Sequence, residues 1–157
     1  MKLSIETEYA LRALAHLAGR PEGEVVGAAE LAAATGVSPA FLSKILQRLT
    51  KAGIVRGYRG GRRGYGLAVA ADRLSALAVV ETLGGPGFFE RCVFRATACG
   101  QGDACPLHDP WSKAREALAS ALASLTIAQI AARGEPQPDG VPATVPKPRL
   151  RARVRSS

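Results

Sequence analysis

Three cysteines and a histidine carry the most distinctive chemistry of this sequence. Cys92, Cys99, Cys105 and His108 form the pattern C-x6-C-x5-C-x2-H. Thiolates are soft ligands that select iron–sulfur clusters, zinc or copper, and three of them with a nearby imidazole make a four-ligand set. The residues alone leave the metal open, because three cysteines and one histidine also form a common structural zinc set. Since an odd number of cysteines argues against a disulfide framework, free or redox-active thiols are the alternative to a metal site.

A basic block is the second chemical feature. The net charge of the chain is +8, which favours a polyanionic partner. No acidic residue lies between Glu30 and Asp72. The same interval contains the basic residues Lys44, Arg48, Lys51, Arg56, Arg59, Arg62 and Arg63. A second basic run lies in a proline-rich terminal segment over 134–157, which has no apolar period and is expected to be a disordered tail.

The elements that carry the basic block are predicted from caps and apolar spacing. Ser4 is an N-cap candidate for the first helix, and Ser38-Pro39 has the composition that opens a helix. Glycines at 36 and 53 are expected to end the second and third helices. The expected elements are helices over 5–18, 28–34 and 39–52, strands over 54–58 and 65–69 around a basic turn, and a helix over 74–83.

The order of these elements predicts a winged helix-turn-helix that binds a double-stranded DNA operator. Two helices, a glycine turn, a capped helix and a hairpin follow one another in the chain. The capped third helix would lie in the major groove, where Lys44 favours guanine and Gln47 can pair with adenine. The arginines of the wing tip suit phosphates or a narrow minor groove. The predicted DNA contacts are Ser38, Ala40, Ser43, Lys44, Gln47 and Arg48 on the helix and Arg59, Arg62 and Arg63 on the wing. A merely solvated basic face is the alternative.

The second half of the chain is predicted to contain a cysteine-bearing loop and a dimerisation helix. Residues 84–109 have no clear apolar period, so this cysteine segment should be a loop that something other than an apolar core orders. Asp109-Pro110 is expected to cap one long helix over 110–133, whose apolar positions Trp111, Ala114, Leu118, Leu122 and Leu125 recur at spacings of three and four. The expected fold is therefore mainly α, with a winged helix-turn-helix domain over 1–83, a two-stranded wing and a long C-terminal helix that forms a homodimer.

Several segments together resemble the Rrf2 family of bacterial winged-helix regulators, whose members include regulators that carry iron–sulfur clusters or respond to iron or nitric oxide. The resemblance rests on MKLSIETEYALRAL, VSPAFLSKILQRLTKAGIV, RGGRRGYGL and CPLHDPW followed later by LTIAQI. Arg59 matches a wing arginine that enters the minor groove. The wing departs at Arg62 and Arg63, where the family usually has glycines. Residues at 40, 43 and 44 also differ from those that contact bases in a relative, so no operator sequence is implied.

The resemblance implies an iron–sulfur cluster, 2Fe-2S or 4Fe-4S, in preference to zinc. The three cysteines would be ligands, and His108 matches a histidine ligand of a relative. Glu8 is the competing fourth ligand, because an acidic residue at this position reaches the cluster of the other subunit in some relatives. An ion pair with Arg12 at i, i+4 is the simpler explanation of Glu8.

These inferences predict a cytoplasmic transcriptional regulator controlled by iron, redox or nitric oxide status. A membrane role is not expected, since no run approaches the roughly 18 apolar residues of a spanning helix. An enzyme is not expected either, because there are two histidines and no nucleophile–base arrangement. The alternatives are a regulator of the same fold that senses through thiols or a small molecule, and a zinc-dependent nucleic-acid-binding protein.

Overall fold

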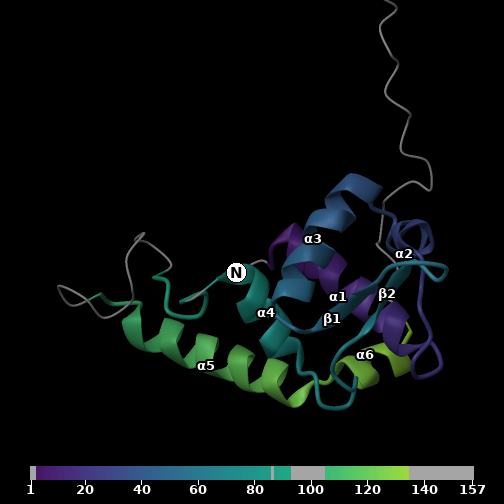
Figure 1. The fold of residues 1–157 in the computed structure, drawn as a ribbon. Helices are drawn as coiled ribbons and strands as arrows, with labels where there is room; N and C mark the ends of the chain where they lie inside the picture. The colour runs from purple at the N-terminus through teal and green to yellow at the C-terminus, as the bar shows by residue number, and fades with distance from the viewer. Residues whose placement is uncertain (1–2, 86, 93–104, 135–157) are drawn as a thin grey trace, which may run out of the picture.

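The described part of the chain folds into a bundle of helices with a small two-stranded sheet (Figure 1). The computed structural model describes residues 3–85, 87–92 and 105–134. The elements are α1 (Ile5–Ala18), α2 (Ala28–Thr35), α3 (Pro39–Lys51), β1 (Val55–Tyr58), β2 (Gly64–Leu67), α4 (Ala76–Gly84), α5 (His108–Ser124) and α6 (Ile127–Ala132). This architecture confirms the predicted fold class. Within the described ranges, no helix is both long and apolar enough to cross a membrane.

Local signals begin α1 and α3 and end α2 as predicted. The Ser4 hydroxyl accepts a hydrogen bond from the amide of Thr7, and the Ser38 hydroxyl accepts one from the amide of Phe41. Between these helices α2 ends at Gly36, whose φ of 70° lies in the left-handed region that glycine adopts without strain. The turn between α2 and α3 is therefore fixed by residue types that are visible in the sequence.

One apolar core joins α1 to the rest of the bundle. Helix α3 buries Leu42, Ile45, Leu46 and Leu49, and it leaves its other face to solvent. The other fully or almost fully buried members include Ala10, Ala13, Leu14 and Leu17 of α1, Leu31 of α2, Val55 of β1, Val79 and Leu83 of α4 and Ile127 of α6. The core thus fixes the buried face of α3, while the exposed face of this helix stays available to a partner.

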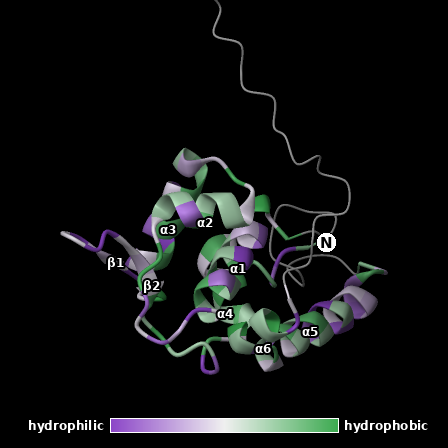
Figure 2. Cartoon of the chain, turned by 90° about the vertical axis from the view of Figure 1, so that its right-hand side faces the viewer, coloured by the Kyte–Doolittle hydropathy of each residue, from purple (hydrophilic) through white to green (hydrophobic). Residues whose placement is uncertain are grey.

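The wing is a short antiparallel hairpin anchored at its base. Strands β1 and β2 pair from Val55 opposite Leu67 to Tyr58 opposite Gly64. Tyr65 exchanges two backbone hydrogen bonds of 2.9 Å with Val26, which precedes α2. Gly64 is required at this crossing, because a Cβ atom there would lie 2.4 Å from the carbonyl oxygen of Val26. The hairpin projects from the bundle, and its tip is largely hydrophilic (Figure 2).

The C-terminal region corrects the prediction of one helix over 110–133. The structure has two helices there, because Leu125 is extended (φ −92°, ψ 117°) and Thr126 begins α6 with a capping box to Gln129. The predicted Asp109-Pro110 cap is also wrong. Helix α5 begins at His108 and has no side-chain capping bond at its N-terminus.

Backbone pairing with the segment before α4 fixes this break. The carbonyl of Leu125 accepts a bond of 2.8 Å from the amide of Ala76, and the amide of Ile127 donates one of 2.9 Å to Leu74. Helix α6 then packs on α1. Helix α5, in contrast, buries no residue fully; it contacts α4 and extends beyond the bundle (Figure 1). The C-terminal region is thus divided between the core and an extended arm.

Candidate DNA-binding surface and cysteine segment

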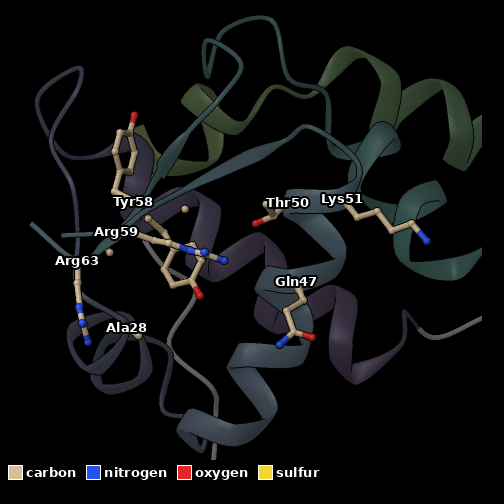
Figure 3. A pocket seen from close by; sticks show the side chains of 10 residues that line it. Ala28, Gln47, Thr50, Lys51, Tyr58, Arg59 and Arg63 are labelled. Carbon is tan, nitrogen blue, oxygen red and sulfur yellow. The ribbon is translucent and has the colours of Figure 1, made fainter.

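A groove open to solvent separates the second half of α3 from the wing. It is lined by Ala28, Gln47, Thr50, Lys51, Gly57, Tyr58, Arg59, Arg63, Gly64 and Tyr65. Figure 3 shows Arg59 extending from the wing into the groove, whereas the ammonium group of Lys51 points away from it. The structure therefore brings together Gln47, Arg59 and Arg63, three of the predicted DNA contacts, from two elements.

The other predicted contacts lie around this groove. Lys44 and Ala40 are exposed on α3, Ser43 is half-buried there, and Arg62 is exposed on the wing tip. Ser38 is exposed at the N-cap of α3, where its hydroxyl is already bonded to the helix backbone. These positions give α3 and the wing a face of polar and basic side chains, with Ala40 as the apolar exception and no acidic residue on either element. Such a face suits a polyanion.

Arg48 is placed differently from the other predicted contacts. One of its nitrogens lies 2.5 Å from a carboxylate oxygen of Glu6, and the other donates to the carbonyl of Leu83 at 2.9 Å and to that of Thr82 at 3.3 Å. These partners belong to the first turn of α1 and the last turn of α4. From its position on α3, Arg48 was predicted to contact DNA. The sequence gave no sign of its contacts with α1 and α4, because Glu6 and Leu83 are distant from Arg48 in the chain.

Both described ends of the cysteine segment meet the first turn of α5. The indole nitrogen of Trp111 donates to the carbonyl of Arg91 at 3.0 Å, next to Cys92. The amide of His108 donates to the carbonyl of Cys105 at 2.9 Å. The backbone next to Cys92 is thus held at the first turn of α5, which also carries His108. Cys99 lies outside the described residues.

A second group of contacts holds the same segment, and the sequence did not reveal it. Arg115 of α5 donates to the carbonyl of Phe89 and to the hydroxyl of Ser112. Phe88 packs so closely on α4 that a Cβ atom on Gly84 would lie 2.6 Å from its ring. Arg115 looks like an ordinary surface residue in the sequence, because its partner is a backbone carbonyl far away in the chain.

The donor set near α5 fits a thiolate-bound metal. Cys92 and Cys105 are both half-buried, and His108 is half-buried at the start of the helix. Two cysteines and a histidine therefore belong to segments held at the N-terminal end of α5, and each is partly shielded from solvent, which suits soft-metal ligation. The described residues contain no group of three or more His, Cys, Asp or Glu side chains arranged as a metal site, and the third cysteine of the pattern falls among residues that are not described.

Glu8 makes the ion pair that its spacing indicates. A carboxylate oxygen of Glu8 lies 2.7 Å from a guanidinium nitrogen of Arg12, whose side chain is 12% exposed. The guanidinium also lies over the ring of Tyr9, at 5.6 Å from its centroid. Within the described residues, Glu8 is thus engaged on its own helix, while 46% of its side chain remains exposed.

Comparisons with known proteins agree with this fold. The profile of the Rrf2 family, described as "Iron-dependent Transcriptional regulator", matches residues 3–133. Two relatives from two strains of Mycobacterium tuberculosis, described as HTH-type transcriptional regulators, are each 34% identical over 137 residues, which cover 87% of this chain and 85% of theirs.

Two solved structures show the same fold. CymR, the global cysteine regulator of B. subtilis, aligns with a TM-score of 0.73 and 22% identity over 85% of this chain and 98% of its own. IscR of T. potens aligns with a TM-score of 0.70 and 24% identity over 86% of this chain and 89% of its own. The winged helix, the extended α5 and the family match lead to one conclusion: the chain belongs to the Rrf2 family of transcriptional regulators.

Proposed function

We propose that the chain is a sequence-specific regulator that binds a double-stranded DNA operator through α3 and the wing. The observation that carries this proposal is the groove that Gln47 of α3 lines together with Arg59 and Arg63 of the wing. A helix of this kind fits the major groove, and a basic hairpin beside it reaches the adjacent backbone or minor groove.

Each part of the surface has a distinct task. Lys44 and Gln47 would contact base edges, because a lysine donates to guanine acceptors and a glutamine amide pairs with adenine. Ser38, Ala40 and Ser43 at the N-terminal end of α3 would fit against the DNA at close range, where small side chains let the helix approach. Arg59, Arg62 and Arg63 would neutralise phosphates or enter a narrow minor groove.

Variants of these residues test the DNA-binding surface. The probe is a duplex that the wild-type protein recovers from a random-sequence pool. Arg59→Ala should weaken binding and lower the slope of log K against log salt by about 0.9 for each phosphate that the variant no longer neutralises. Arg133→Ala, at an exposed position after α6, is the matched control and should change neither. An unchanged affinity and slope for Arg59→Ala would refute the role of the wing.

Base contacts should show a different signature. Lys44→Ala and Gln47→Ala should alter the preference between duplexes, at about 1–3 kcal/mol for each good base contact. A variant that weakened every sequence equally would identify its residue as a backbone contact instead.

We propose further that α5 forms a homodimer with a second copy. The helix leaves Trp111, Leu118 and Leu122 half-buried, and it extends beyond the bundle without burying any residue fully. Pairing two such helices would cover this apolar stripe. A twofold dimer would place the two α3 helices about one DNA turn apart, roughly 34 Å.

The proposed sensor is the cysteine segment over 84–109. Cys92, Cys99 and Cys105, with His108 or alternatively Glu8 of the other subunit, would hold an iron–sulfur cluster of the 2Fe-2S or 4Fe-4S type. A bound cluster supplies an iron site that iron supply, redox state or nitric oxide can alter. Trp111 and Arg115 fasten the segment to α5, and Phe88 fastens it to α4. If this segment became more or less ordered, both α5 and the DNA-binding unit would therefore be affected. A hundredfold change in DNA affinity requires only about 2.7 kcal/mol.

Ligand variants test the sensor. Cys92→Ala and Cys105→Ala should each abolish the visible absorption of anaerobically reconstituted protein while the dimer stays folded, because neither residue belongs to the apolar core. His108→Ala and Glu8→Ala then identify the fourth ligand, since only the true ligand should change the spectrum or the lifetime of the chromophore markedly; we expect the larger effect from His108. Stoichiometric zinc would favour the zinc alternative, and metal-free protein whose DNA affinity changes on thiol oxidation would favour a thiol sensor.

A further inference from the structure

Arg48 lies on the exposed side of α3 but outside the groove. Gln47 and Lys51 line the groove, whereas Arg48 does not. Successive helix residues are about 100° apart, so Arg48 points well away from the direction of Gln47. That direction leads to α1 and α4, and the two helices supply every partner of the Arg48 guanidinium that the structure describes.

The partners of Arg48 are the groups that a fixed cation stabilises. Glu6 belongs to the first turn of α1 and provides a carboxylate at 2.5 Å. Thr82 and Leu83 belong to the last turn of α4, whose carbonyls have no partner within their own helix. The C-terminus of a helix also carries partial negative charge that attracts a cation. One guanidinium therefore ties three helices together at a single point.

We propose that Arg48 is a positioning residue that sets α3 against α1 and α4 and does not contact the DNA backbone. The inference rests on the proposed use of α3 in DNA binding. The same contacts of Arg48 with α1 and α4, here called the junction, also connect α3 to the cysteine segment. The last turn of α4 leads directly into the cysteine segment, so the cation that orients the recognition helix also holds the point at which that segment begins.

The direction in which Glu6→Gln changes DNA affinity distinguishes this positioning role from a phosphate contact. If Arg48 contacted DNA, Glu6→Gln would release a competing partner and remove a negative charge, and DNA binding would tighten. If Arg48 positions α3, the same substitution loosens the junction, and binding weakens. The expected loss is about two- to fivefold, the size that a partly exposed ion pair supplies.

The experiment compares Arg48→Met, Glu6→Gln and the double variant on the duplex that the wild-type protein recovers from a random-sequence pool, with Arg59→Met as the contrasting variant. Arg48→Met should weaken binding by about three- to tenfold, because a charged hydrogen bond is lost with the ion pair. Its salt slope should stay at the wild-type value, whereas that of Arg59→Met should fall. The double variant should be no weaker than Arg48→Met alone, since both changes break the same junction.

A measurement without DNA keeps this test separate from the proposed DNA-binding surface. The amide of Gly85 donates to the carbonyl of Glu81 in the last turn of α4. Arg48→Met and Glu6→Gln should both accelerate hydrogen exchange at Gly85 by about threefold or more, and Arg59→Met should not. Tighter DNA binding by Glu6→Gln, a reduced salt slope for Arg48→Met, or unchanged exchange at Gly85 would each overturn the proposal. If the wild-type protein selected no duplex, the DNA-binding surface would fail, and the exchange result would still decide the role of Arg48.

Discussion

Truncating Ile127 tests whether α6 belongs to the core of the DNA-binding unit. Its side chain is 0% exposed and packs in the cluster that contains Leu14 and Leu17 of α1. Ile127→Ala removes three buried carbons, and at about 0.8 kcal/mol for each the transfer term alone is about 2.4 kcal/mol. The cavity left behind adds to this loss, so we expect a decrease of about 2–5 kcal/mol in the free energy of unfolding.

Urea unfolding of the metal-free protein at one fixed concentration measures this loss, because dimer stability depends on concentration. Ile130→Ala is the matched control: Ile130 is on the same helix and packs only partly buried against the core, so its truncation should cost clearly less. The midpoint should fall with little change in the slope. A cost below about 1 kcal/mol for Ile127→Ala, or an equal cost for both variants, would refute the assignment of α6 to the core.

Three further substitutions probe the wing, the arm and the break between α5 and α6. Gly64→Ala places a Cβ atom 2.4 Å from the carbonyl oxygen of Val26, so DNA affinity should fall while the helical circular dichroism remains; full affinity would contradict the crossing. Leu118→Lys should convert the proposed dimer to a folded monomer in sedimentation analysis, because it puts a charge on the half-buried face of α5, and a persistent dimer would argue for another interface. Thr126→Ala removes the hydrogen bond to Gln129 and should cost about 1 kcal/mol in thermal unfolding, an effect that would be absent if the cap were unimportant.

The sequence predicted the first four helices and the wing because their signals are local. Ser4 and Ser38 cap helices through bonds to residues three positions later, and Gly36 ends α2 with a backbone conformation that suits glycine. The apolar spacing of α3 also matched its buried face. Residue type and short spacing carry all of this information.

The division of the C-terminal region was missed because distant backbone groups impose it. The apolar period continues through Leu122 and Leu125, so the pattern alone favours one helix. Bonds from Ala76 to Leu125 and from Ile127 to Leu74 create the break, and neither partner is near in sequence. The capping box that begins at Thr126 was the one local signal available.

In the candidate site, too, the contacts between distant residues could not be predicted from the sequence. The cysteine pattern was visible in the sequence, and the structure adds that the chain next to Cys92 is fastened to α5 by Trp111 and Arg115. Arg48 was grouped with the DNA contacts by charge and position alone, because its partners come from the first turn of α1 and the last turn of α4. Long-range polar contacts of this kind leave no periodic signal.

The proposed regulation depends most directly on whether the cysteine segment controls DNA binding through a bound cluster. The decisive measurement is the affinity of the anaerobically purified protein for its selected duplex, before and after chelation of iron, with iron and sulfide determined on the same samples. We predict visible absorption, iron and acid-labile sulfide in the starting protein and, on their loss, a change in affinity of about tenfold or more, which corresponds to about 1.4 kcal/mol. Identical affinities for the two forms, or zinc in place of iron and sulfide in protein made with ample iron, would contradict this mechanism.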